Sequence, residues 1–234
     1  DYDRNSGYTS NAVTLEWKTA TFDYDRGTKI AVDTQDNAES MNIAFGRAGA
    51  ELMRTKVAPE ADAYTFAKIA GTEGITTVAE DFADAETFLS ALLKATTKMD
   101  EDEVPSEQRI LYSTPTLLNS VKALDTYKSR EALQGFAKVV PVPSTRFYTK
   151  IKLLSGKDTE LDGGYKKAED GHVINFLIVH KPSVMKWDKH TVSNVIPASN
   201  NIESDSDVLK YRKYGIVDVY ANKVAGIYLS ASAK

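Results

Sequence analysis

Residues 36–71 read DNAESMNIAFGRAGAELMRTKVAPEADAYTFAKIAG and are the most regularly patterned part of this 234-residue chain. Apolar residues recur along the first half of this stretch at helical spacing, which predicts one apolar face of a long amphipathic helix. These residues are Met41, Ala44, Phe45, Ala48 and Leu52. Asp36 followed by Glu39 is typical of a capping box, so we expect the helix to begin at Asp36.

The second half of the stretch contains Pro59, which has no N–H group and clashes with the preceding helical turn. We therefore predict a kink near Ala58–Pro59. A second, shorter helix should start after it and close at Gly71, because proline is favoured at helix starts and glycine just past helix ends.

Upstream of this stretch, residues 12–22 alternate in polarity, with Val13, Leu15 and Trp17 on one side. We predict a strand there, a turn at 23–27 and a second strand at 28–32. A two-stranded ribbon cannot bury both faces by itself. Two alternatives remain open at this point: the ribbon packs on its own domain, or it packs on a neighbouring subunit.

Downstream, helical and strand patterns follow one another, which indicates an α+β chain. We predict helices at 81–98, from Thr114-Pro115 onward, at 126–137 and at 182–186. Strands are predicted at 109–113, 138–142, 146–154, 172–180, 192–196, 208–220 and 225–229. The nearly continuous apolar run in 172–180 predicts a fully buried strand. Residues 221–223 are predicted to join the last two strands as a hairpin, and residues 72–79, 155–171 and 200–207 are predicted loops.

Composition excludes several classes of protein. The chain has no cysteine, which excludes disulfides and thiolate metal sites and fits a reducing cytoplasm. Its net charge is −4 and no Lys/Arg run exceeds two residues, so we expect no specific grip on nucleic acid. No apolar run reaches the roughly 18 residues of a membrane span. The chain begins at Asp1 without a methionine, and we expect further residues upstream.

No motif in the sequence carries a recognisable reaction. The three histidines do not form a metal-binding pair, and no nucleophile elbow or phosphate-binding loop is present. Asp158, Asp162 and Glu169 match positions of a calcium-binding loop. Glu160 is too long for its position in that loop, and the preceding IKLL reads as a strand, so a plain acidic surface loop is the preferred interpretation. We expect no catalytic residues and no cofactor.

Several segments together resemble the major capsid proteins of tailed bacteriophages and prophages. The segments are YDRNSGY (2–8), VTLEWKTATFDYDRGTKIAVDTQDNAES (13–40), RTKVAPEADAYTFAKIAG (54–71), VPSTRFYTK (142–150), INFLIVHKPSV (174–184) and YRKYGIVDVYANKVAGIYLS (211–230). Each is weakly specific alone, but they cover nearly the whole chain in order. The resemblance implies an α+β chain with the Hong Kong 97-like capsid fold.

That fold implies a domain plan. Residues 1–22 would be the tip and descending strand of an extended loop that lies on an adjacent subunit. Residues 23–71 would form a peripheral domain with a spine helix, and residues 72–205 an axial domain. Residues 206–234 would return to the peripheral domain as strands. The residues expected at subunit interfaces are Tyr2, Arg4, Tyr8, Trp17, Arg26, Arg54 and Glu60.

The resemblance also implies a function. The chain would self-assemble through pentamers and hexamers into an icosahedral shell that encloses a tailed-phage DNA genome. Implied partners are a scaffolding function, a portal, head-decoration or completion proteins, and double-stranded DNA held without specific binding. Its location would be the virion capsid, assembled in the bacterial host cytoplasm without a membrane. Some shells of this fold carry a Lys–Asn crosslink, but no residue pair here aligns with it.

Two other functions stay open. One is an encapsulin-like nanocompartment shell, which would have the same fold and package protein cargo instead of DNA. The more distant one is a calcium-binding or enzymatic domain that uses the 158–169 loop. It would require a pocket with perturbed titratable groups, and the sequence identifies none.

Overall fold

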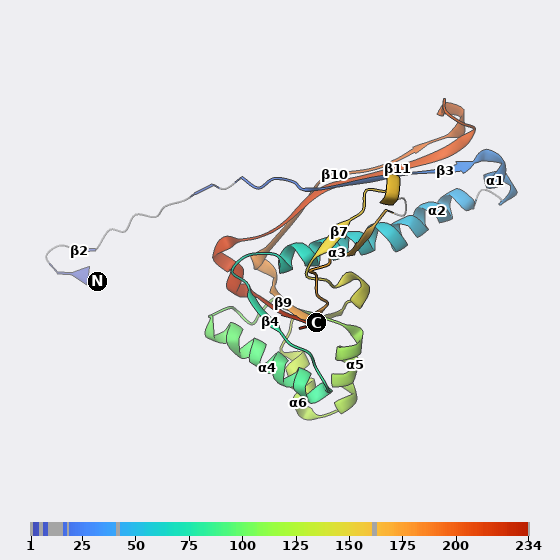
Figure 1. Cartoon of the computed structure of the whole chain (residues 1–234). Helices are drawn as coiled ribbons and strands as arrows, with labels where there is room; N and C mark the ends of the chain where they lie inside the picture. Colours follow the sequence, from blue (N-terminus) through green and yellow to red (C-terminus); the bar gives the residue numbers. More distant parts are fainter. Residues whose placement is uncertain are drawn as a thin grey trace.

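The computed structural model describes residues 2–4, 7–8, 16–17, 19–40, 43–160 and 163–233. Figure 1 shows a long ribbon of strands lying along a long helix, with a second group of helices and strands packed below them. Near the N-terminus, β1 (Tyr2–Asp3) and β2 (Gly7–Tyr8) form a minimal antiparallel pair. Because the structure contains both helices and mixed or antiparallel sheets, the chain is of the α+β class, as predicted.

The patterned stretch forms one long helical rod, here called the spine helix, that runs from α2 (Ala44–Leu52) through a π-helical turn (Met53–Val57) into α3 (Ala58–Ala70). The predicted kink at Pro59 is replaced by this π-helical turn, in which the N–H of Ala58 bonds to the carbonyl of Met53. The wider turn accommodates Pro59, which cannot donate a hydrogen bond to the helix.

The predicted helix start at Asp36 is wrong. Asp36 lies inside a separate short helix, α1 (Thr34–Glu39), whose N-cap is Asp33. The Asp33 carboxylate accepts a hydrogen bond from the Gln35 N–H at 2.8 Å. Either aspartate can cap a helix, and Asp33 does so because β3 ends at that residue.

Three antiparallel strands make a sheet that we call the ribbon sheet: β10 (Val184–Ile196), β11 (Ser206–Val219) and β3 (Tyr24–Asp33), in that order. The predicted turn at 23–27 is wrong, because residues 25–27 lie inside β3 and pair with residues 212–214. Gly27 fits here because a β-carbon would stand 3.2 Å from the Tyr211 carbonyl. Of the predicted strand at 12–22, residues 12–15 and 18 lie outside the described residues, and 16–17 and 19–22 form no strand.

A five-stranded mixed sheet forms the lower part of the molecule. Its order is β4 (Thr76–Ala79), β12 (Ile227–Ala231), β9 (Ile174–His180), β5 (Arg109–Ser113) and β6 (Lys138–Pro141). The central strand β9 is buried almost throughout, which confirms the prediction for this apolar run. The structure corrects the predicted loop at 72–79, because β4 lies there and pairs in parallel with β12.

Helices cover both faces of the five-stranded sheet. On one face lie α4 (Ala85–Glu101), α5 (Pro115–Leu124) and α6 (Tyr127–Gln134), which confirm the helical patterns predicted in these regions. On the other face lies α3, whose Phe66 and Ile69 pack in a core with Leu177 and Leu229. The alternation of β9 side chains therefore builds two cores, with Phe176 in one and Leu177 in the other.

The last strands do not form the predicted hairpin. β11 belongs to the ribbon sheet and β12 to the five-stranded sheet, and the 3₁₀ segment Ala221–Gly226 crosses between them. Gly226 allows this crossing, because a β-carbon there would stand 2.1 Å from the Ser183 hydroxyl. The predicted helix at 182–186 is likewise a 3₁₀ turn, Lys181–Ser183, that leads directly into β10.

A small hairpin extends beside the spine helix. It consists of β7 (Ile151–Leu153) and β8 (Tyr165–Lys167), so the predicted strand at 146–154 is shorter and the predicted loop at 155–171 contains a strand. Further 3₁₀ turns occur at Ser144–Arg146, Asp158–Glu160 and Ala198–Asn200.

The two cores and the apolar face of α2 should differ in their contribution to stability. Phe176 is fully buried, whereas Phe45 is only half-buried and no residue of α2 is buried. We expect Phe176→Ala to lower the free energy of unfolding by about 3–5 kcal/mol and Phe45→Ala by less than about 2 kcal/mol. Chemical denaturation of both variants measures this difference, and equal losses would contradict the observed burial.

Candidate assembly surfaces

A partly buried ion pair joins the ribbon sheet to the spine helix. The Arg26 Nε of β3 donates to Glu60 Oε1 of α3 at 2.6 Å, and Arg26 Nη2 donates to Glu60 Oε2 at 3.0 Å. Arg26 Nη2 also donates to the carbonyls of Leu154 (2.8 Å) and Gly164 (3.3 Å) in the β7–β8 hairpin. One guanidinium therefore holds three parts of the fold together, and its planar fork suits this two-point pairing.

Two tyrosines complete the same junction. The Tyr24 hydroxyl donates to Glu60 Oε1 at 3.2 Å, and burial followed by the Glu60 charge raises the pKa of Tyr24 well above its ordinary value. The Tyr64 hydroxyl donates to Asp23 Oδ1 at 2.5 Å, and Lys68 pairs with the same carboxylate. Burial raises the pKa of Asp23, but the hydrogen bonds from Lys68 and Tyr64 outweigh it and leave the pKa below its ordinary value.

The sequence-predicted interface residues thus fall into two groups. Arg26 and Glu60 meet inside the chain, where Glu60 is 7% exposed. Arg54 lies on the surface and pairs with Glu51 at 2.6 Å, as the i,i+3 spacing permits. The Trp17 side chain is 91% exposed and Arg4 is also exposed. The side chains of Tyr2 and Tyr8 lie outside the described residues.

In the candidate calcium loop, the Glu160 carboxylate accepts hydrogen bonds from groups of the protein itself. Lys152 Nζ donates to Glu160 Oε1 at 2.7 Å and the Ser155 N–H donates to Oε2 at 2.8 Å. These bonds, that from Lys152 most strongly, lower the pKa of Glu160 to about 2. Asp158 lies in a 3₁₀ turn and Asp162 outside the described residues. Within the described ranges, no group of three or more His, Cys, Asp or Glu side chains could hold a metal ion.

The described histidine side chains do not form a metal-binding cluster either. His172 precedes β9 and His180 ends it, and the side chain of His190 is outside the described residues. Burial first, and then the positive charges of Arg109 and Lys223, lower the pKa of His180.

One feature was missed by sequence reasoning: a hollow of about 510 Å³ between the spine helix and the β7–β8 hairpin. We call it the basic hollow. Its charged lining residues are Lys56, Arg146, Lys166 and Lys167, with Tyr148 and Tyr165 beside them. The Lys166-Lys167 pair was visible in the sequence, but its position beside Lys56 depends on the hairpin folding against the helix. No helix in the part of the chain that the structure describes is long and apolar enough to cross a membrane.

Breaking the ion pair at the junction should destabilise the fold. We expect Glu60→Gln to lower the free energy of unfolding by about 3 kcal/mol, because it leaves the Arg26 guanidinium partly buried beside a neutral amide. Lys29→Met, which removes the exposed pair between Lys29 and Glu203, is the matched control and should cost less than about 1 kcal/mol. Urea denaturation of both variants measures the difference, and a Glu60→Gln loss no larger than the control would show that the pair is dispensable.

No protein-family model matches the chain, and no curated protein does either. Among solved structures, a chain of Mycobacterium phage Che8 matches with a TM-score of 0.59 at 13% identity, covering 89% of this chain and 70% of that one. The capsid of the Cyanophage P-SCSP1u matches with a TM-score of 0.56 at 14% identity, covering 100% and 81%.

A third match is the virus-like particle from Pyrococcus furiosus, with a TM-score of 0.61 at 10% identity, covering 92% of this chain and 79% of that one. At these identities the likeness concerns the path of the backbone, and it extends over both sheets and the spine helix. The chain therefore has the Hong Kong 97-like fold of tailed-phage capsid proteins, as the sequence resemblance implied.

Proposed function

We propose that this chain is the major capsid protein of a tailed bacteriophage. Copies of it assemble through pentamers and hexamers into an icosahedral shell that encloses double-stranded DNA. The observation that carries this proposal is the match of nearly the whole chain to phage capsid structures, including 100% coverage against the Cyanophage P-SCSP1u capsid. The role is structural rather than catalytic, and the protein needs no cofactor for it.

The fold suits a shell subunit that must keep its shape when neighbouring subunits press on it. The ribbon sheet and the spine helix form an elongated unit, and the Arg26–Glu60 pair resists sliding of one along the other. We assign this unit to the peripheral domain and the five-stranded sheet with its helices to the axial domain. The limits differ from the predicted 72–205 and 206–234, since β10 begins at Val184 and β12 joins the five-stranded sheet. Residues 1–22 remain our candidate for the extended loop.

The proposed partners follow from the shell. They are further copies of this chain, a scaffolding function, a portal and head-decoration or completion proteins. DNA is enclosed without specific binding, which agrees with a net charge of −4. The proposed location is the virion capsid, with assembly in the bacterial host cytoplasm.

A second candidate function is a nanocompartment shell that encloses protein cargo. The match to the Pyrococcus furiosus virus-like particle, with a TM-score of 0.61, favours keeping it. Both candidates share a closed shell, and they differ in content. Particles isolated from the native host distinguish them: nuclease-protected DNA inside the particles supports the capsid, and a protein cargo without DNA supports the nanocompartment.

The mass of the particles that the purified full-length chain forms is the direct test of assembly. We expect rings of five or six copies, or closed shells, because a subunit of this fold must contact several neighbours. Light scattering on a sizing column gives the mass, and negative-stain images of the same peak give the shape. A monodisperse monomer or dimer at high concentration, also in the presence of the native scaffolding function, would contradict the proposal.

Trp17 provides a more local test. Its side chain is 91% exposed, which is unusual for the largest apolar side chain and fits a residue that a neighbouring subunit covers. We expect Trp17→Ala to reduce the assembled fraction while leaving the unfolding free energy of the monomer unchanged. Sedimentation velocity measures the first quantity and urea denaturation the second, and equal effects on both would place Trp17 in the core of its own chain instead.

A further inference from the structure

The basic hollow lies where the spine helix is π-helical. Lys56 comes from that turn, Lys166 and Lys167 come from β8, and Arg146 ends the 3₁₀ turn before the hairpin. π-helical turns are rare and often mark functional sites, since they displace side chains from the regular helical register. Four cationic residues from three segments therefore line one hollow of about 510 Å³.

Six cationic residues lie at or near this hollow, and within the described part of the chain three of them are paired with carboxylates and three are not. Arg146 pairs with Asp62 at 3.1 Å, and the hairpin's Lys150 and Lys152 pair with Asp170 and Glu160. By contrast, Lys56, Lys166 and Lys167 have no carboxylate partner among the described residues. Three lysines without a carboxylate partner in the described part of the chain, placed beside a concave surface, are an attractive site for an anionic group on another molecule.

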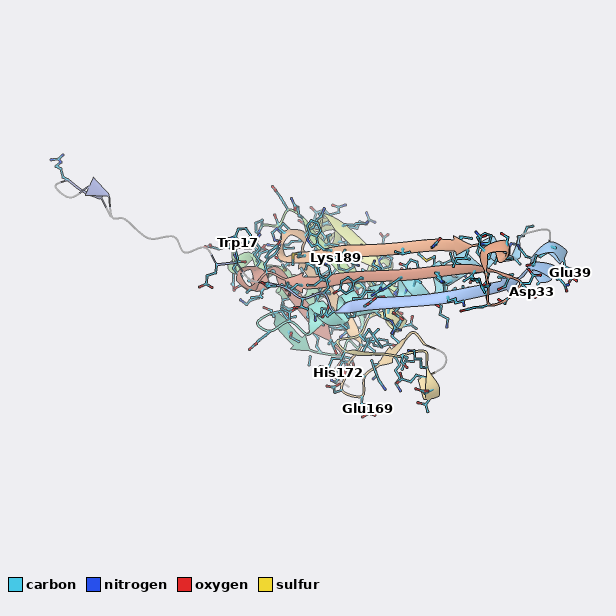
Figure 2. The ribbon with its side chains drawn as sticks, turned by 90° about the horizontal axis from the view of Figure 1, so that it is seen from above. Trp17, Asp33, Glu39, Glu169, His172 and Lys189 are labelled. Carbon is cyan, nitrogen blue, oxygen red and sulfur yellow. The ribbon has the colours of Figure 1, made fainter. Side chains whose placement is uncertain are left out.

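The same chain carries a projecting cluster of acidic residues. The far end of the ribbon sheet, which we call the acidic tip, bears Asp33, Asp36 and Glu39 around α1 and Asp205 before β11. All four residues are exposed. Figure 2 shows Asp33 and Glu39 at the end of the three strands, beyond the rest of the molecule.

We propose that the acidic tip of one copy docks into the basic hollow of the next copy. This inference rests on the proposed function, because it specifies one contact between shell subunits. A chain cannot fill its own hollow, since the helix from Ala44 to Thr55 alone separates the two sites by about 16 Å, at about 1.5 Å per residue. The contact joins two different surfaces of identical chains, so its repetition builds rings or continuous arrays.

Charge explains why such a contact is needed. Identical chains with a net charge of −4 repel one another at long range. A basic hollow that receives an acidic tip turns this repulsion into local attraction at a defined place. Because both sides are exposed, the attraction is screened by salt over about 10 Å at 0.1 M ionic strength, so assembly through this contact weakens as salt is raised.

The test reverses the charges on each side separately and then together. The hollow variant is Lys166→Glu with Lys167→Glu, and the tip variant is Asp36→Lys with Glu39→Lys. Tip residues Asp36 and Glu39 are chosen because they are exposed and, unlike Asp33, do not cap α1. The matched control is Lys122→Glu with Lys128→Glu, which makes the same charge change on exposed residues of α5 and α6. An unchanged melting temperature of each variant confirms that it folds.

Sedimentation velocity of the full-length chain at low salt reports the assembled fraction. We expect the hollow and tip variants each to raise the concentration needed for assembly by about tenfold or more. The chain that carries both reversals should regain wild-type assembly, because the tip and hollow charges are exchanged and again opposite. The control should behave as the wild type.

Four results would overturn the docking proposal. Assembly that ignores both reversals, or a combined chain that does not recover, excludes this contact while leaving the proposed function intact. A hollow variant that assembles normally but loses binding to a short DNA duplex assigns the hollow to phosphate groups instead. A wild-type chain that stays monomeric contradicts the proposed function itself, and with it any docking between copies.

Discussion

The fold depends on one helix that serves two sheets at once. α3 turns Glu60 toward the ribbon sheet, where Arg26 holds it, and turns Phe66 and Ile69 toward the five-stranded sheet. The ion pair fixes how the ribbon sheet is placed against α3. The apolar core supplies most of the stabilisation, because an ion pair removed from water must first recover the cost of desolvating both charges.

The parts that could be predicted from sequence are those whose signal is local. Helical periodicity located α4 and the spine helix, and the apolar run at 174–180 located β9. The missed strands depend on distant partners. β4 is short and partly polar, and it is a strand because β12, some 150 residues later, pairs with it. Residues 25–27 have turn-forming composition, but pairing with β11 overrides it.

The candidate surfaces show the same limit more sharply. The Trp17 side chain is exposed, and its predicted role at a subunit interface stays a prediction. The partners of Arg26 and Glu60 could not be predicted from their residue types. Arg26 could have faced a neighbour or its own chain, and only the three-dimensional approach of α3 to β3 decides between them. The basic hollow likewise requires segments near residues 56, 146 and 166 to meet, and no sequence pattern encodes that meeting.

The ribbon sheet has two outer edges, formed by β3 and β10, whose backbone groups face away from the other strands. An exposed edge strand can pair with the edge strand of another chain. β10 carries a register shift between Asp188 and His190, and lysines lie along both edge strands, Lys29 on one and Lys186 and Lys189 on the other. These features make edge-to-edge pairing costly, so a contact between two copies of the chain would depend on side chains rather than on extension of the sheet.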